Sequence, residues 1–292
     1  MKYASYRSTV VAAQTLANAP FYAKNGSLDV RLASSEEEIL AAQALRYSIF
    51  YEEMDAIPDA RMARARRDVD DYDMICDHLL VIDHDKPGGP RVVGTYRLLR
   101  QLVAQAYRGF YSASEYDLTP LLSATFQQRI GAGRQLLELG RSCVHKDYRT
   151  AQTINLLWRG IASYLAQHHI GYMFGCASFA GTDPRRHGVP LSYLYHEHLV
   201  PDDLYVRALP ARHEAMNQLP RDAYDVREAL RALPPLIKGY LRLGCFVGDG
   251  AVVDAQFNTT DVFILLPVER ITRRYSDRYS IERLANDPVA AA

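Results

Sequence analysis

The pattern of hydrophobic positions along the chain predicts a sheet with helices between its strands. Short runs of apolar and β-branched residues are typical of strands, which we expect at 28–32, 78–83, 91–100, 136–145, 171–178, 251–257 and 262–267. Helical spacing of apolar residues predicts helices at 36–50, 118–126, 151–168, 192–199 and 237–243. Strands 136–145 and 171–178 flank one of these helices, so we expect them to pair in parallel.

The strand at 136–145 is unusual because it combines a buried pattern with charged residues. Glu138, Arg141 and His145 interrupt a run that is otherwise apolar. A charge in a core strand is costly unless it is paired or used. Gly140 indicates a β-bulge that would redirect Arg141. We therefore expect this strand to carry functional side chains.

A short polar turn, residues 146–150, separates this strand from the helix at 151–168. A strand, turn and helix in this order present free backbone N–H groups to an anion at the helix N-terminus. Arg149 and Thr150 lie in the turn, where they would contact such an anion.

Residues 55–77 carry a dense run of opposite charges. Four arginines, 61, 64, 66 and 67, are followed by five aspartates, 68, 70, 71, 73 and 77. One interpretation is a solvated, partly mobile loop whose charges pair with each other. The other is a cover over an active site, in which Asp73 and Asp77 bind a cationic substrate.

We expect one main domain with three additions. Residues 1–27 are polar and rich in small residues, which predicts a loosely attached N-terminal extension. The domain covers residues 28–275 and includes a polar, proline-rich insertion at about 209–235. Residues 276–292 form a C-terminal tail.

Composition excludes several classes of protein. The 292 residues have a net charge of zero, so nucleic acid is not an expected partner. The four cysteines are scattered, which favours reduced thiols over disulfides or zinc. No signal peptide and no long apolar run is present. We expect a cytoplasmic protein without a metal, with peripheral contact at the cytoplasmic face of the inner membrane as a further option.

Several motifs together resemble one branch of the GNAT N-acyltransferases, the branch of the autoinducer synthases and the bacterial ornithine N-acyltransferases. Three of them are residues 45–53 (LRYSIFYEE), 93–99 (VGTYRLL) and 137–142 (LELGRS). Residues 236–244 (LIKGYLRLG) and 254–261 (DAQFNTTD) resemble the ornithine acyltransferases specifically. The resemblance implies an α/β (α+β) fold of GNAT type, with a mixed central sheet flanked by helices.

The resemblance also implies positions for the amine substrate. Arg46, Phe50, Arg97, Glu138 and Arg141 match residues that build the amine site in autoinducer synthases. Burial would raise the pKa of Glu138, which makes it the first candidate general base. A structural ion pair of Glu138 with Arg97 or Arg141 is the alternative, and His145 is the second candidate base. Asp254 and Asp261 are further candidates for binding the amine.

The turn after the central strand informs the choice of acyl donor. GNAT enzymes that use coenzyme A generally have a glycine-rich turn there, whereas residues 146–151 contain no glycine. Arg149 and Thr150, at the helix N-terminus, would hold the single phosphate of a phosphopantetheine arm. Backbone N–H groups near Cys143 and Val144 would hold the carbonyl oxygen of the acyl group, which makes Val144 a further contact of the arm. Acyl carrier protein is therefore the expected partner, and no cofactor is required. Basic residues that would form a docking rim are Lys146, Arg149, Arg159, Arg185 and Arg186.

These expectations combine into one leading hypothesis. The protein would transfer a 3-hydroxyacyl chain from acyl carrier protein to the α-amino group of ornithine, which yields lyso-ornithine lipid. The alternatives are an autoinducer synthase or another long-chain N-acyl amino acid synthase, and a non-catalytic module that binds acyl carrier protein. Residues 51–54 (YEEM) lack the tryptophan expected in autoinducer synthases. That difference favours a simple amino acid over a nucleoside-bearing substrate.

Overall fold

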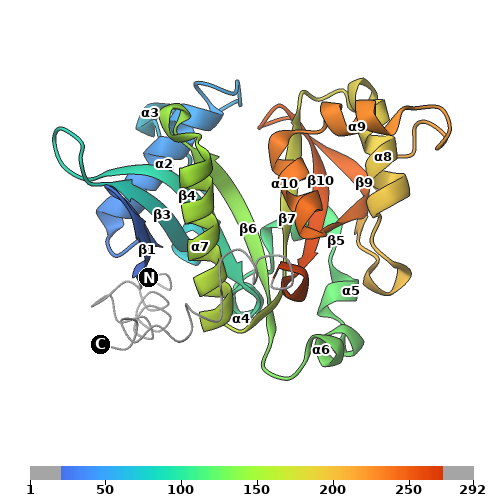
Figure 1. The fold of residues 1–292 in the computed structure, drawn as a ribbon, viewed down its shortest axis with the longest axis horizontal. Helices are drawn as coiled ribbons and strands as arrows, with labels where there is room; N and C mark the ends of the chain where they lie inside the picture. Colours follow the sequence, from blue (N-terminus) through green and yellow to red (C-terminus); the bar gives the residue numbers. More distant parts are fainter. Residues whose placement is uncertain (1–20, 272–292) are drawn as a thin grey trace.

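A computed structural model describes residues 21–271 and places their strands in one mixed sheet. The order across the sheet is β1-β2-β3-β4-β6-β7-β10-β9-β8-β5 (Figure 1). Neighbouring strands are antiparallel except β6 with β7 and β8 with β9, which are parallel. The strand bounds are β1 Phe21–Asn25, β2 Leu28–Leu32, β3 Asp77–Asp83, β4 Arg91–Arg100, β5 Tyr116–Asp117, β6 Gln135–Val144, β7 Ile170–Ala180, β8 Arg207–Ala208, β9 Phe246–Asp254 and β10 Thr259–Pro267.

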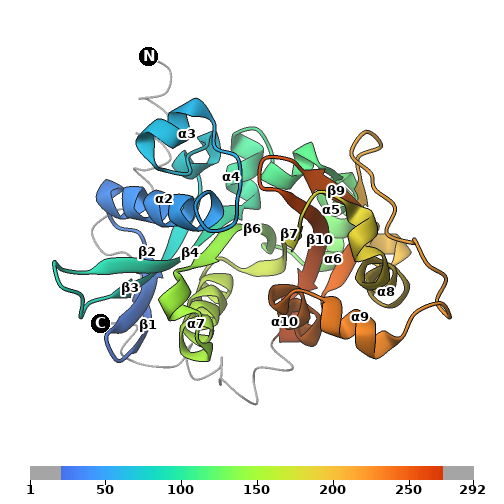
Figure 2. The ribbon, with the colours of Figure 1, turned by 90° about the horizontal axis from the view of Figure 1, so that it is seen from above.

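Helices cover both faces of the sheet. Figure 2 shows α7 and α10 on one side and α2 with α3 on the other. Gly160 of α7 lies so close to Val30 of β2 that an added Cβ would be 2.6 Å from the valine side chain. The helix bounds are α2 Glu36–Phe50, α3 Ala60–Ala65, α4 Gln101–Ala106, α5 Thr119–Leu122, α6 Ala124–Ile130, α7 Ala151–Gln167, α8 Gly188–His198, α9 Val226–Ala232 and α10 Pro235–Leu243. None of the helices in residues 21–271 is long and apolar enough to cross a membrane.

Local sequence signals account for where the main helices begin and end. Ser35 caps α2 by accepting a hydrogen bond from the Glu38 backbone, as serine does at helix N-termini. Thr150 caps α7 in the same way. Gly244 ends α10 with φ of 85°, a conformation that glycine adopts without strain.

The predicted fold is confirmed, with corrections at four places. Residues 21–25 form β1, which pairs with β2, so the N-terminal extension expected over 1–27 is wrong for that part. The helix expected at 118–126 is two short helices, α5 and α6, and the strand expected at 251–257 runs from 246 to 254 as β9. The insertion at 209–235 contains α9, and its Ala229 and Leu233 join the main core. Residues 1–20 and the tail expected at 276–292 lie outside the described residues.

Strands β6 and β7 diverge in the middle of the sheet. Their parallel pairs end at Glu138 and Phe174, although β6 continues to Val144 and β7 to Ala180. Gly175 follows at once, and an added Cβ there would lie 2.2 Å from the carbonyl oxygen of Leu139. The absence of a side chain at 175 therefore lets the two strands approach at the point where they separate. We call this point the fork.

A β-bulge lies on the other side of β6. The register with β4 shifts between Thr95 and Arg97, so that three steps along β6 face two steps along β4. Arg141 has φ of 51°, which is uncommon for a residue with a side chain. The bulge expected from Gly140 is confirmed, and it turns Arg141 toward the same cavity as Glu138.

Substituting Gly175 tests whether the fork depends on this close approach. A methyl group at 175 would overlap the Leu139 carbonyl, so Gly175→Ala should lower the free energy of unfolding by about 1–3 kcal/mol. Gly140→Ala is the matched control, because a Cβ at 140 has nothing within 4 Å. Thermal and urea unfolding measure both, and equal stability of the two variants would contradict the interpretation.

Candidate active site

A cavity of about 570 Å³ opens where β6 and β7 diverge. Its wall includes residues 138–144 of β6 and 176–178 of β7, together with the end of α2 and the start of α10. Polar residues of the segment 111–115 and of the β9–β10 hairpin close the far side. The fork thus gives two chain segments from the sheet core a shared, accessible pocket.

Glu138 is buried in the wall of this cavity, with 4% of its surface exposed. Its Oε1 accepts hydrogen bonds from the Ser112 backbone at 2.7 Å and the Ser112 hydroxyl at 2.5 Å. Its Oε2 accepts one from the Tyr111 backbone at 2.8 Å. Burial raises the pKa of Glu138, while these hydrogen bonds oppose the rise. A carboxylate has about four acceptor positions, so one on Oε2 is left for a substrate proton.

The alternative of a structural ion pair for Glu138 does not describe the structure. Among residues 21–271, no arginine lies within ion-pair distance of Glu138, and neither Arg97 nor Arg141 hydrogen-bonds to it. Both arginines instead pair with aspartates of the charged stretch. The carboxylate of Glu138 is held by hydrogen-bond donors of segment 111–112, which keeps one side of it toward the cavity.

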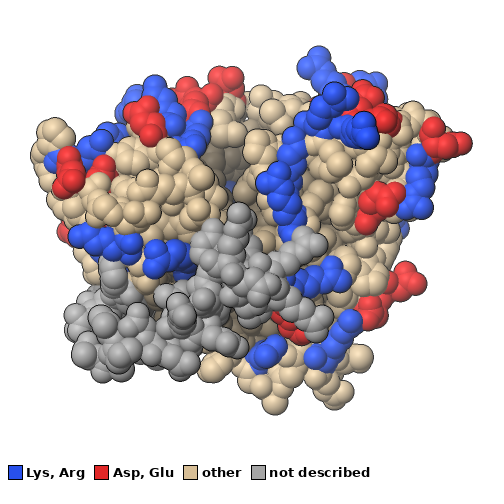
Figure 3. Space-filling model, viewed as in Figure 1, with Lys and Arg blue, Asp and Glu red and all other residues tan. Residues whose placement is uncertain are grey.

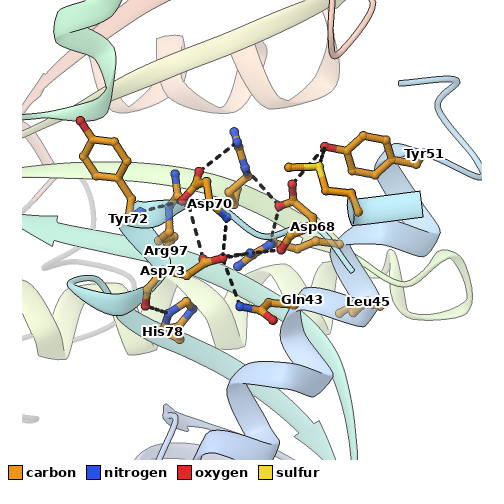
Figure 4. Close-up of polar contacts among 12 residues, drawn as sticks. Gln43, Leu45, Tyr51, Asp68, Asp70, Tyr72, Asp73, His78 and Arg97 are labelled. Atoms are coloured by element: carbon orange, nitrogen blue, oxygen red, sulfur yellow. Dashed lines mark hydrogen bonds and ion pairs between the residues drawn. The ribbon is translucent and has the colours of Figure 1, made fainter. Parts of the chain in front are cut away.

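Arg46 binds the charged stretch through two aspartates, Asp68 and Asp73, which lie close together in Figure 4. Its side chain is fully buried, and its Nε lies 2.7 Å from Asp68 Oδ2. Its Nη2 lies 2.8 Å from Asp73 Oδ2 and 2.6 Å from the Asp68 carbonyl oxygen. Tyr51 donates to the other oxygen of Asp68 at 3.1 Å. A buried cation is thereby neutralised by two carboxylates from the same chain segment.

Arg97 and Arg141 join this network from strands β4 and β6. Arg97 lies 2.6 Å from Asp70 and 3.4 Å from Asp73. Arg141 lies 3.2 Å from Asp68 and 3.3 Å from Asp70. Three arginines and three aspartates therefore form one continuous cluster, which we call the arginine–aspartate cluster. Of its members, Arg97 and Arg141 also line the cavity.

The expectation of a solvated loop or cover at 55–77 is wrong for Asp68, Asp73 and Asp77. Asp68 and Asp73 are 1% and 5% exposed, and both are bound to Arg46. Asp77 does not line the cavity; it lies 3.2 Å from Arg100 and accepts a hydrogen bond from Tyr164 at 2.5 Å. The structure thus places neither Asp73 nor Asp77 where an amine in the cavity would meet it.

The structure brings most of the other expected residues to one cavity. Those that line it are Phe50, Arg97, Glu138, Arg141, Val144, Arg149, Asp254 and Asp261. Arg46 lies below it in the arginine–aspartate cluster, and Thr150 caps α7. His145 does not line the cavity: its Nδ1 accepts a hydrogen bond from the Asp147 backbone at 3.4 Å. Among the two candidate bases, the geometry favours Glu138.

Arg149 lies at the wall with its guanidinium held by a carboxylate. Its Nη1 and Nη2 lie 2.5 and 2.9 Å from the two oxygens of Glu53, a bidentate pair. Its Nε donates to the Val144 carbonyl oxygen at 3.0 Å. This pair is about half exposed, so an anion arriving at the cavity can compete with Glu53 for the arginine.

Carboxylates gather at the end of the cavity formed by the β9–β10 hairpin. Burial and the neighbouring Asp261 and Asp254 raise the pKa of Glu115 to about 7. Burial also raises the pKa of Asp261 to about 6. Arg212 lies 3.2 Å from Glu115 and offsets part of this charge. This end of the cavity is suited to a cation.

The pattern of the sequence did not point to several cavity residues. Ser112 and Glu115 come from an irregular segment without periodicity, and Ser112 reaches a strand 26 positions away. Cys176 lies on β7, where its Sγ is 3.7 Å from Glu115 Oε2. Burial raises the pKa of the Cys176 thiol well above its ordinary value. The only signal available was that two acidic residues, Glu115 and Asp117, follow a cluster of tyrosines.

Comparison with known proteins identifies the family. The chain matches the family described as acetyltransferase (GNAT) domain over residues 45–159. It is 50% identical over 262 residues to the L-ornithine N(alpha)-acyltransferase of Brucella abortus (strain 2308), which covers 88% of this chain and 90% of that protein. It is 49% identical over 258 residues to the L-ornithine N(alpha)-acyltransferase of Rhizobium meliloti (strain 1021), with 88% and 85% covered. The chain belongs to the L-ornithine N(alpha)-acyltransferase family.

The solved structures that match the chain are much more distant in sequence. The N-acyl amino acid synthase FeeM from uncultured soil microbes shares 11% identity, with a TM-score of 0.46 over 84% of this chain and 93% of that one. The acyl-homoserine lactone synthase LasI shares 15% identity, with a TM-score of 0.40 over 82% and 91%. The family membership rests on the sequence relatives, and it makes the protein an acyltransferase with a GNAT-type fold.

Acyl transfer to an amine makes two chemical demands on a site. The amine must lose a proton as it attacks, and the acyl carbonyl oxygen must be stabilised as charge develops on it. Glu138 lines the cavity with one acceptor position free. Residues 139–144 of β6, beyond its pairs with β7, line the same cavity.

Replacing Glu138 tests its role as proton acceptor. Glu138→Gln keeps the size and one oxygen but cannot take the proton, so turnover should fall by a factor on the order of 10²–10⁴. Steady-state kinetics and thermal unfolding together measure this. Glu197→Gln is the control, since Glu197 pairs with Arg221 at the surface away from the cavity. Unchanged turnover in Glu138→Gln would remove this residue from the mechanism.

Replacing Asp73 tests whether the arginine–aspartate cluster is structural. Asp73→Asn leaves Arg46 and Arg97 short of a buried partner, and we expect unfolding to become easier by about 3–5 kcal/mol. The neighbouring Asp71→Asn should change stability by less than about 1 kcal/mol, because its pair with Arg108 is exposed. If Asp73→Asn is as stable as the parent and instead weakens amine binding, Asp73 serves the substrate after all.

Proposed function

We propose that this protein transfers a 3-hydroxyacyl chain from acyl carrier protein to the α-amino group of L-ornithine and forms lyso-ornithine lipid. The observation that carries the proposal is that one cavity is lined by the fork, by Glu138, by Arg149 and by the acidic residues Glu115, Asp254 and Asp261. The relatives named L-ornithine N(alpha)-acyltransferase support ornithine as the acceptor. A cationic amino acid also fits a cavity whose acidic residues outnumber its basic ones.

The proposed reaction needs only groups of this chain and its two substrates. The α-amine nitrogen attacks the thioester carbonyl carbon, so that a C–N bond forms and the C–S bond breaks. Glu138 accepts the proton that the nitrogen loses, and the leaving thiolate of the phosphopantetheine arm takes up a proton in turn. Donors on β6 beyond the fork, near Cys143 and Val144, would stabilise the oxyanion.

A small apolar hollow lies next to the fork. It is lined by Leu139, Met173, Tyr240 and the β10 residues Ile264 and Leu266. Its volume is about 20 Å³, enough for roughly one water molecule. These walls would have to move apart to admit an acyl chain at this point.

The end of the cavity at Arg149 favours a carrier protein as the acyl donor. Arg149 and the N-terminus of α7 provide contacts for one phosphate, and the glycine-free turn offers no cradle for a pyrophosphate. Lysine and arginine side chains gather on both sides of the hollow between the two halves of the molecule (Figure 3). On the α9–α10 side these are Arg227, Arg231, Lys238 and Arg242. An acidic carrier protein fits such a basic rim.

The choice of donor provides one test. We expect 3-hydroxyacyl carrier protein to exceed 3-hydroxyacyl-coenzyme A in kcat/KM by about tenfold or more, and Arg149→Ala to raise the KM for the carrier-linked donor by roughly tenfold. Arg129→Ala is the control, because Arg129 pairs with Asp203 away from the cavity. Equal use of both donors would contradict the interpretation of the turn.

The reaction itself is tested by product analysis. Purified protein incubated with 3-hydroxyacyl carrier protein and L-ornithine should release N(alpha)-acylornithine, identified by mass spectrometry with fragmentation that locates the amide. Homoserine, S-adenosylmethionine and glutamine serve as competing acceptors in parallel reactions. Preferred acylation of S-adenosylmethionine would instead indicate an autoinducer synthase, and no product with any acceptor would indicate a non-catalytic module.

A further inference from the structure

Two polar atoms in the acidic end of the cavity lack a well-aligned hydrogen bond. Asp261 and Thr259 are 8% and 6% exposed, and both line the cavity. Asp261 Oδ1 and Thr259 Oγ1 form no well-aligned hydrogen bond with any described residue. The hydroxyls of Ser178 and Thr259 lie close enough to the Asp261 carboxylate to lower its pKa, and burial outweighs them. The two residues alternate on β10, so their side chains lie on the same face of the strand. A buried polar atom without a partner is costly, which indicates that a ligand completes it.

We propose that Asp261, Thr259 and Glu115 bind the side-chain ammonium group of the acceptor amino acid and thereby decide which of its two amines is acylated. This inference rests on the proposed acylation of ornithine. An ammonium group has three N–H donors and no acceptor. The site offers three acceptors of matching kind, two carboxylates and a hydroxyl, from two separate parts of the fold.

The charged groups around Asp261 favour the binding of a cation at this site. Glu115 and Asp254 face it as further acids, and both line the cavity with it. The basic groups nearby are Arg212, which pairs with Glu115, and Arg141, which pairs with the arginine–aspartate cluster. Cys176 and Tyr116 are further titratable neighbours, and the pKa of each is raised by burial and by both Glu115 and Asp261. The Tyr116 hydroxyl donates to the Asp261 carbonyl oxygen at 3.1 Å. Carboxylates held this close repel each other until a positive charge comes between them.

Binding the side-chain ammonium has a consequence for the reaction. An amine held between carboxylates keeps its proton, and a protonated amine has no lone pair for attack. The α-amine of the same molecule then remains as the nucleophile that can reach Glu138. The acidic end would therefore set regiochemistry as well as affinity, and it would reject amino acids whose side chain is neutral.

Comparing two amino acid substrates, ornithine and norvaline, tests the ammonium site separately from the catalytic groups. Norvaline has the carbon chain of ornithine without the second amine, so its α-acylation requires Glu138 but not the ammonium site. The parent protein should prefer ornithine to norvaline in kcat/KM, and Asp261→Asn should narrow that preference by roughly tenfold or more. The kcat/KM for norvaline should change much less than that for ornithine, because norvaline has no side-chain ammonium group that the lost carboxylate charge would have bound. Glu115→Gln should act in the same direction.

A matched control lies on the same hairpin. Asp249 of β9 is also a buried carboxylate at 8% exposure, but it pairs with Tyr205 and Arg207 and does not line the cavity. Asp249→Asn should therefore keep the ratio of ornithine to norvaline. An unchanged ratio in both Asp261→Asn and Glu115→Gln overturns the inference.

Thermal unfolding gives a second readout that needs no turnover. The pKa of Asp261 is raised to about 6 in the folded protein, so its contribution to stability is present at low pH and is lost as the pH rises through 6. At pH 8 the buried charge opposes folding, and Asp261→Asn should raise the melting temperature of the ligand-free protein. Added ornithine should raise the melting temperature of the parent more than that of the variant, whereas norvaline should not distinguish them.

The two readouts also separate this inference from the proposed function. If the parent binds ornithine in the thermal assay and loses this on Asp261→Asn, the ammonium site stands even when no acylornithine is formed. If acylornithine is formed but Asp261→Asn melts lower than the parent and keeps the preference for ornithine, the carboxylate is structural and the inference is overturned.

Discussion

Three arginines buried beside one cavity have to be neutralised, and much of the molecule is arranged around that requirement. Arg46 comes from α2, Arg97 from β4 and Arg141 from β6, so their positive charges meet where a helix packs on the centre of the sheet. The counter-charges come from a single segment, Asp68 to Asp73. Its ion pairs with the three arginines hold this segment next to the cavity. Removing one partner from such a cluster leaves a buried charge, which is far more costly than an exposed pair.

The same cluster explains why the central strand is irregular. Arg141 occupies a left-handed conformation in the β-bulge, and this costs on the order of 1–3 kcal/mol for a residue other than glycine. In return, its guanidinium reaches both Asp68 and Asp70 and still forms part of the cavity wall. The bulge and the fork lie within four residues of each other on β6, so one short segment connects the buried charges to the reactive space.

Local patterns predicted the parts of the fold that depend on neighbouring residues in the chain. Most of the longer strands and the bulge beside Gly140 follow from a few adjacent side chains. The charged strand likewise pointed to Glu138 and Arg141. The aspartates of residues 55–77 were misjudged because they follow a group of arginines in the sequence. From the sequence alone, such a stretch looks the same whether its aspartates are solvated or are neutralised by arginines of other elements. Glu115 and Ser112 escaped notice for a related reason, since their partners lie far away in sequence.

The protonation state of the cysteines in the cavity wall indicates whether the acyl group is transferred through a cysteine thioester. Burial raises the pKa of Cys143 to about 12, and those of Cys76 and Cys176 are raised as well. A thiol that keeps its proton is a poor nucleophile, so these side chains are unsuited to carry the acyl group as an enzyme thioester. The acyl chain then has to pass from donor to acceptor without a stop on sulfur. A direct transfer, without any acyl-enzyme, would require both substrates to be bound at the same time. Its kinetic signature is a sequential pattern of intersecting lines in place of the parallel lines of a ping-pong enzyme.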